Sequence, residues 1–278
     1  MIKLEAVALT DPGKERQVNE DRVWAQVYEA SEGETVGLFI VCDGIGGHLG
    51  GECASHWAVE TVKHELQKLF CPPDPRATVH LSKEELESWL HTGQTTHLSQ
   101  IRKIEDRVRE AIEKANRVVY EYAQQNPDQA ADAGTTISMA LVTGSRTIVA
   151  NVGDSRTYLL RGDRMRQITK DHSLVASLVA SKQIKPEEIF NHPQRNLIFR
   201  SLGNKKEVQV DTFIETLKEG DYLLLCTDGL WEMVQDEKTL VRIIKESKTL
   251  EEAGQQLLEA ANTAGGEDNI GLVIVKAT

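Results

Sequence analysis

The chain is 278 residues long and carries 43 acidic and 32 basic side chains, which gives a formal net charge of −11. A chain this negative is repelled by nucleic acid and by anionic membranes, so we expect it to bind neither. Its longest apolar runs, such as 37–42 and 222–226, are far shorter than the roughly 20 residues of a membrane-spanning helix, and no signal segment opens it, so we expect a cytoplasmic protein.

Nine strands are predicted from alternating runs rich in Val, Ile, Leu and Tyr. In chain order they cover residues 2–9, 22–28, 36–42, 136–143, 146–152, 155–161, 209–215, 221–227 and 270–276. Apolar residues at helical spacing predict helices over 54–69, 108–122 and 240–261, and the last must break near 247–249. Because the strands cluster apart from the helices, the pattern favours an α+β layered sandwich over a doubly wound fold.

Two segments between these elements are predicted to be less regular. Residues 71–103 open with three closely spaced prolines and are predicted to form a surface insertion. Residues 172–200 hold helical patterns that break at Pro186 and Pro193, and Pro186 suits the first turn of a helix. We expect this second segment to be a flap near a functional site.

Three aspartates stand at the ends of apolar, strand-like runs. Asp43 follows one run, Asp228 follows another, and Asp268 comes just before the last. A single Asp-Gly is more often only a turn, but three beside separate strands indicate a shared site, because strand ends bring distant residues together. A pocket of carboxylates without His or Cys suits Mg²⁺ or Mn²⁺ and disfavours zinc.

A charged segment near the N-terminus supplies Arg16 and the pair Glu20 and Asp21 directly before a predicted strand. Taken alone, such a cluster is usually a solvated loop. Together with the three aspartates it predicts phosphate chemistry, because a guanidinium can bind phosphate oxygens in bidentate fashion while carboxylates extend a metal cluster through water.

Eight motifs in the chain resemble those of the type 2C metal-dependent Ser/Thr protein phosphatases, in their bacterial form, and they follow the same order. They are Arg16 with Asn19-Glu20-Asp21, Asp43-Gly44-Ile45-Gly46-Gly47-His48, Ala133-Gly134-Thr135-Thr136, Gly153-Asp154-Ser155-Arg156, Thr169-Lys170-Asp171-His172-Ser173, His192-Pro193-Gln194-Arg195-Asn196, Thr227-Asp228-Gly229-Leu230-Trp231 and Glu267-Asp268-Asn269-Ile270. Any one of these motifs would be weak evidence of the resemblance. Eight in the same order, spanning nearly the whole chain, leave little room for chance.

The resemblance implies a four-layer α-β-β-α sandwich with two central antiparallel sheets, formed by a single domain over residues 1–278. It also implies a metal-dependent enzyme that hydrolyses phosphoserine and phosphothreonine with a water activated between two cations, Mn²⁺ or Mg²⁺. The expected substrates are proteins phosphorylated by a Ser/Thr kinase, and we expect a monomer.

Carried over residue by residue, the resemblance assigns a role to each motif residue. Asp43 would bridge the two cations, the Gly44 carbonyl would help to hold one, and Asp228 and Asp268 would hold the other. Further residues would act around them: Glu20 and Asp21 through metal-bound water, Asn269 by orienting its neighbour, and Arg16 by binding the phosphoryl group.

Two positions depart from the family pattern. Ile45 stands where eukaryotic members carry a His that protonates the leaving group, so water, His48 or another group must serve. Ala131 stands where the family has an Asp for a third cation, and Asp132, one residue later, is the candidate replacement. Gly153 and Asp154 are interpreted as a structural turn after a core strand.

Two other functions remain open from the sequence. A catalytically inactive family member could act as a regulatory binding module, although all the main metal positions are present. A phosphatase with Asp43 as nucleophile would need a second Asp at position 45, which is Ile. The chain also lacks the G-x-x-x-x-G-K-[ST] loop of nucleotide-binding enzymes.

Overall fold

A computed structural model describes residues 2–29, 35–46, 50–67, 97–130 and 132–278. His48, Ala131 and most of the predicted insertion at 71–103 lie outside these ranges. No helix among the described residues is long and apolar enough to cross a membrane.

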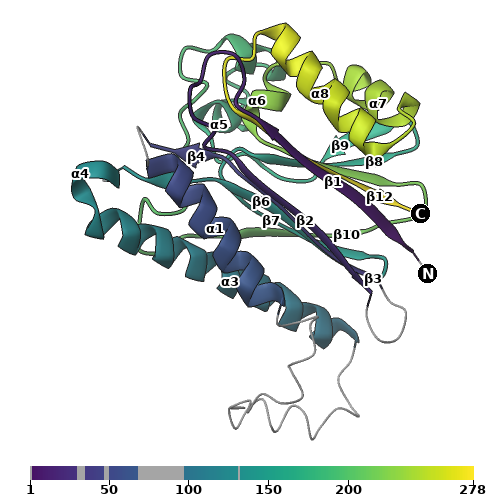
Figure 1. Cartoon of the computed structure of the whole chain (residues 1–278), viewed down its shortest axis with the longest axis horizontal. Coiled ribbons are helices and arrows are strands. Elements are labelled where there is room, and N and C mark those ends of the chain that lie inside the picture. The colour runs from purple at the N-terminus through teal and green to yellow at the C-terminus, as the bar shows by residue number, and fades with distance from the viewer. Residues whose placement is uncertain (1, 30–34, 47–49, 68–96, 131) are drawn as a thin grey trace, which may run out of the picture.

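Two five-stranded antiparallel sheets lie face to face and form the centre of the structure (Figure 1). The first sheet has the strand order β1 (Leu4–Asp11), β12 (Ile270–Ala277), β11 (Tyr222–Cys226), β8 (Arg156–Arg161) and β9 (Arg164–Gln167). The second has the order β10 (Asp211–Thr216), β7 (Arg146–Val152), β6 (Ile137–Thr143), β3 (Thr35–Cys42) and β2 (Arg22–Glu29). The predicted sandwich of two antiparallel sheets is confirmed.

Strand β3 is buried along its whole length because both of its faces are covered. Phe39 and Val41 pack into the core between the sheets. Leu38 and Ile40 point the other way, into a core shared with helices. Side chains alternate between the two faces of a strand, so a strand buried on both faces is apolar along nearly all of its length.

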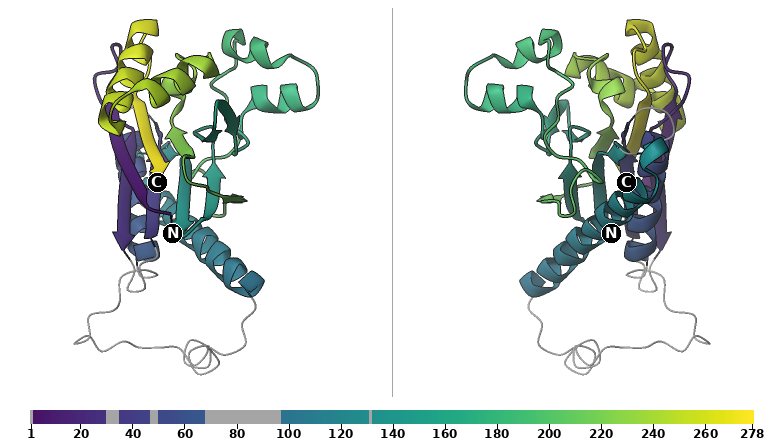
Figure 2. Two further views of the ribbon diagram at one scale, coloured as in Figure 1. Left: turned by 90° about the vertical axis from the view of Figure 1, so that its right-hand side faces the viewer. Right: turned by 90° about the vertical axis from the view of Figure 1, so that its left-hand side faces the viewer.

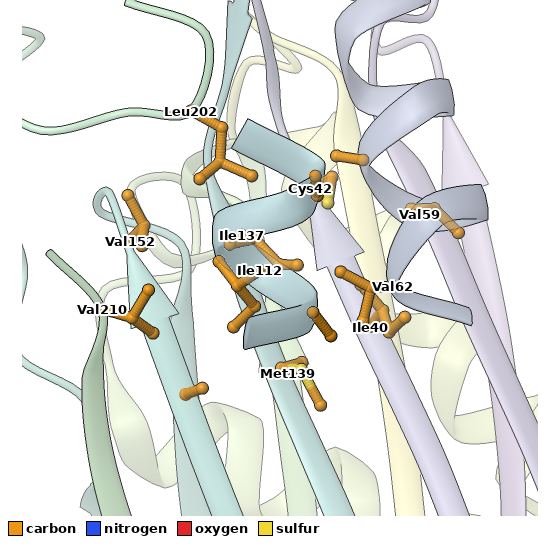
Figure 3. Close-up of a cluster of buried hydrophobic side chains, with 14 of the residues drawn as sticks. Ile40, Cys42, Val59, Val62, Ile112, Ile137, Met139, Val152, Leu202 and Val210 are labelled. Atoms are coloured by element: carbon orange, nitrogen blue, oxygen red, sulfur yellow. The ribbon is translucent and has the colours of Figure 1, made fainter. Parts of the chain in front are cut away.

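Helices cover the outer face of each sheet. Helices α1 (Gly50–Gln67) and α3 (His97–Gln125), with the short α4 (Pro127–Ala130), lie on the second sheet, where Val59, Val62 and Ile112 pack near Ile40 (Figure 3). Helices α7 (Glu237–Glu246) and α8 (Leu250–Ala264), with the short α6 (Asp228–Trp231), cover the first sheet. The layers therefore follow the predicted order α-β-β-α.

All nine predicted strands are present, with ends shifted by up to two residues. Strand β9 was not predicted, because its sequence Arg-Met-Arg-Gln has none of the apolar alternation that marks a strand. The two-residue strands β4 (Gly44–Ile45) and β5 (Gly134–Thr135) are too short to leave a pattern. The predicted helix break at 247–249 is confirmed, since α7 ends at Glu246 and Thr249 caps α8 with its side chain.

The segment predicted to be a flap, 172–200, contains helix α5 (Leu174–Ala180) and the 3₁₀ helix η1 (Pro186–Asn191). Pro186 is the first residue of η1, as its sequence position predicted. The two ends of the segment meet at the sandwich, where the Phe199 N–H donates to the His172 carbonyl oxygen at 2.9 Å. The segment projects to one side of the layers (Figure 2). Of the predicted insertion, the described residues 97–103 form the start of α3.

Candidate active site

A cavity of about 520 Å³ opens at the end of the sandwich marked by β4 in Figure 1. Asp43, directly after β3 of the second sheet, lies on its wall. Asp228 and Asp268, which flank β11 and β12 of the first sheet, lie on the same wall. The structure thus brings together the three aspartates that the sequence placed at separate strand ends. The complete lining is Arg16, Gln17, Val18, Glu20, Asp43, Gly44, Ile45, Gly46, Asn196, Asp228 and Asp268.

The backbone of Asp43 is fixed by the neighbouring Gly-Thr-Thr segment. Its N–H donates to the Thr136 hydroxyl at 3.0 Å, and its carbonyl accepts from the Thr135 hydroxyl at 2.7 Å. Burial, with the nearby charges of Asp228 and Asp21, raises the pKa of the Asp43 carboxyl well above its usual value. The carboxylate is therefore held in a place where its negative charge requires a positive partner.

Asp228 opens the one-turn helix α6, and burial is again the main cause of its raised pKa, followed by the charges of Asp154 and Asp268. One of its oxygens, Oδ1, is buried without a hydrogen-bond partner among the described residues. A buried carboxylate oxygen in this condition is costly unless a cation or a donor group reaches it.

Asp268 lies at the cavity mouth beside Arg16. The Arg16 guanidinium donates to Asp268 Oδ2 at 2.8 Å, and the backbone N–H of Asn269 donates to Oδ1 at 2.8 Å. This pairing places Arg16, predicted to bind phosphate, next to a predicted metal ligand.

The Asn269 side chain fastens the loop that carries Arg16. Its Oδ1 accepts from the Glu20 N–H at 2.8 Å, and its Nδ2 donates to the carbonyls of Pro12 and Val18 at 2.9 and 3.0 Å. Asn269 thus orients Asp268 with its backbone and the N-terminal loop with its side chain.

Glu20 is part of the cavity wall, and Asp21 lies outside it. Glu20 lines the cavity, but its Oε1 is buried without a partner among the described residues, and burial raises its pKa. Asp21 is completely buried and does not line the cavity. Its Oδ2 accepts from the Thr227 hydroxyl at 2.7 Å, its Oδ1 has no partner in the described part of the chain, and burial raises its pKa to about 7.

Ile45 and Asp132, the two residues considered where the chain departs from the family pattern, differ in their relation to the cavity. Ile45 lines the cavity and offers no proton. Asp132 is exposed and is not part of the cavity wall, although its backbone carbonyl lies beside Gly46.

Three further residues belong to the site although no role there was predicted for them. Asn196, from the flap, lines the cavity. Asp154 is buried with its pKa raised to about 7, chiefly by burial, and it adds to the repulsion on Asp228. Thr227 holds Asp21. The motifs around Asn196 and Asp154 were visible in the sequence, but only the structure shows what they approach.

The carboxylate set fits divalent cations. Glu20, Asp21 and Asp228 each bury an unpartnered oxygen, and mutual repulsion adds to burial in raising the carboxyl pKa values. Within the described ranges no three acidic, His or Cys side chains already form a cage for one ion. Mg²⁺ needs no such cage, because it keeps several waters and takes only one or two carboxylates.

Known proteins resemble the chain over nearly all of its length. A profile of the protein phosphatase 2C family matches residues 14–261. The serine/threonine phosphatase Stp of Listeria innocua is 37% identical over 267 residues, which cover 96% of this chain and 93% of that protein.

Solved structures give the same result. The Mycobacterium tuberculosis serine/threonine phosphatase PstP superposes with a TM-score of 0.77 at 31% identity and 99% coverage of both chains. The catalytic domain of PstP solved with two manganese ions superposes with a TM-score of 0.73, at 29% identity and full coverage of both chains. The chain belongs to the protein phosphatase 2C family of serine/threonine phosphatases, in its bacterial form.

Proposed function

We propose that this protein removes phosphate from phosphoserine and phosphothreonine in proteins, with divalent cations bound at the carboxylate cavity. The observation that carries the proposal is the meeting of Asp43, Asp228 and Asp268, from both sheets, at one cavity with Arg16 at its mouth. Full-length similarity to phosphatases supports an active enzyme over an inactive binding module.

Two cations, Mn²⁺ or Mg²⁺, would be held by Asp43, the Gly44 carbonyl, Asp228 and Asp268. Bound there, they supply a water of lowered pKa as the nucleophile and neutralise charge on the phosphoryl group. Glu20 and Asp21 would accept hydrogen bonds from waters around the ions. Asn269 would keep Asp268 and the N-terminal loop in place through the four hydrogen bonds described above.

Arg16 would bind and orient the phosphoryl group. Only one of its nitrogens is engaged by Asp268, and a guanidinium offers five N–H donors in a planar fork that matches phosphate oxygens. Holding the phosphoryl group in line with the attacking water lowers the entropic part of the barrier. Arg16 also offsets negative charge as the serine or threonine oxygen departs.

Further proposals concern the opposing kinase, the cellular location, the oligomeric state and a third cation. The phosphorylated substrates would be the products of an opposing Ser/Thr kinase. Free thiols at Cys42, Cys53 and Cys226 are consistent with work in the reducing cytoplasm, and the protein would act as a monomer. Asp132 stays a proposal for a third cation, and because it lies outside the cavity wall, D132N should leave the binding of the first two ions unchanged.

The test is phosphate release from a phosphothreonine peptide by chelator-treated protein as Mn²⁺ is added back. We expect turnover that is absent in chelator and saturates with Mn²⁺. The R16A variant should show a raised KM and a lowered kcat, with its Mn²⁺ dependence retained. Saturable Mn²⁺ binding without turnover on any phosphopeptide would instead favour the inactive binding module.

A further inference from the structure

Helix α6, which begins with Asp228, is one turn long and is packed from two sides. On one side Gly229 faces the carbonyl oxygen of Asn269 so closely that a Cβ at position 229 would collide with it. On the other side Trp231, the last residue of α6, lies buried under the guanidinium of Arg156, whose Cζ is 3.5 Å from the indole centroid. The indole N–H donates to the Asp154 carbonyl at 3.2 Å.

Arg156 is itself firmly held, because each of the three nitrogens of its guanidinium donates a hydrogen bond. Its Nε donates to both Asp171 oxygens at 3.1 Å, its NH2 group donates to Oδ2 at 2.7 Å, and its NH1 group donates to the Tyr158 hydroxyl at 3.0 Å. The side chains of Arg156 and Asp171 are only 11% and 6% exposed. A planar cation fixed in this way forms a flat support on which the indole of Trp231 rests.

The Asp228 carboxylate depends on that support more than the carboxylates of Asp21 and Asp268 do. Asp21 accepts from Thr227, and Asp268 accepts from Arg16 and the Asn269 N–H. Among the described residues, no hydrogen bond reaches the Asp228 carboxylate, and its Oδ1 is buried without a partner. Its position is therefore set by the packing of α6 and not by direct contacts to its oxygens.

We propose that Arg156 is a positioning residue for cation binding, which acts through Trp231 and α6 to place the Asp228 carboxylate. The proposal rests on the proposed function, because it takes Asp228 as a ligand of the cations. Residues around the ligands of a metal commonly change its affinity by about 10- to 100-fold when they are replaced. Arg156 would do so although it lies outside the cavity wall.

The experiment compares R156K with R161K, a matched control on the same strand. Arg161 also makes a bidentate pair, with Nε at 3.0 and 3.2 Å and NH2 at 2.6 Å from the Asp221 oxygens, but among the described residues it has no aromatic partner, and it does not line the cavity. Titration calorimetry of Mn²⁺ into chelator-treated protein should give a Kd raised about 10-fold or more in R156K and unchanged in R161K. At saturating Mn²⁺, kcat of R156K should return to within about threefold of the parent.

If R156K does not fold, W231F takes its place, since phenylalanine keeps a ring but stacks more weakly and loses the bond to Asp154. Its Kd for Mn²⁺ should rise by about threefold or more. Equal Mn²⁺ affinity in R156K, R161K and the parent would overturn the positioning role, as would a kcat that excess Mn²⁺ does not restore. D228N separates the two claims: unchanged Mn²⁺ binding in D228N would contradict the proposed cation site itself.

Discussion

Individual carboxylates at the cavity carry an electrostatic cost in the absence of a cation. Burial raises the pKa of Asp21 to about 7, whereas the unfolded chain has a value near 3.8. Between these values the folded protein binds more protons than the unfolded protein, so this group makes the free energy of unfolding fall as pH rises from about 4 to about 7. The pKa values of the Asp43 and Asp228 carboxyl groups are also raised by burial.

D21N should therefore stabilise the protein in chelator while weakening its cation site. Asparagine has nearly the same shape and can still accept from Thr227, but it carries no charge. In urea unfolding with chelator at pH 8, the free energy of unfolding of D21N should exceed that of the parent by about 2 kcal/mol. This difference should shrink as the pH is lowered toward 5. Saturating Mn²⁺ should reverse the order. A parent that is more stable than D21N in chelator at pH 8 would show that Asp21 is ionised at little cost.

At the residue scale, the sequence was informative where chemistry coincided with a pattern. Asp43 and Asp228 could be predicted because each ends a buried strand. The roles of Thr227 and Asp154 could not be predicted. Thr227 donates a hydrogen bond to Asp21, and Asp154 raises the pKa of Asp228, and the members of each pair are far apart in the chain and meet only after folding.

At the scale of elements, helix α6 shows how tightly the site is packed. G229A places a Cβ against the Asn269 carbonyl, so α6 must shift. We expect a loss of about 2 kcal/mol in the free energy of unfolding, as overpacking typically costs, and weaker Mn²⁺ binding. G162A is the control: Gly162 has a φ of +60° and open space around it, so alanine there should cost about 1 kcal/mol without changing Mn²⁺ affinity. Equal Mn²⁺ affinity in both variants would contradict this account of α6.

We propose that the segment predicted to be a flap, 172–200, contributes to substrate selection, a role we also expect for the predicted insertion at 71–103. Leu197 and Phe199 lie near the end of this segment and are 50% and 54% exposed. They follow Asn196, which lines the cavity. The double variant L197A/F199A should lower kcat/KM on phosphoproteins by about 30-fold or more, because each apolar side chain would contribute roughly 1–2 kcal/mol when a bound protein covers it, and should leave p-nitrophenyl phosphate hydrolysis unchanged.

The matched control for the flap is I214A, since Ile214 is 52% exposed on strand β10 and does not line the cavity. I214A should leave both rates unchanged. Parallel losses on the small and the protein substrates in L197A/F199A would mean that these side chains support the structure and do not contact the substrate.

For the whole molecule, the layered architecture could be predicted because the central strands are apolar runs and the covering helices carry apolar residues at helical spacing. The pairing order could not, because hydrogen-bonded neighbours such as β8 and β11 are far apart in the sequence. The convergence of three aspartates at one end of the sandwich follows from that pairing order and is the basis of the central claim.

The most direct test of that claim is the number of Mn²⁺ ions bound by the chelator-treated protein at equilibrium, measured alongside phosphatase activity for the parent, D228N and D236N. Asp236 caps α7 at the exposed surface and serves as the control. The account predicts two tightly bound ions and full activity in the parent and in D236N, and the loss of at least one ion together with activity in D228N. Two ions and full activity in D228N would contradict it.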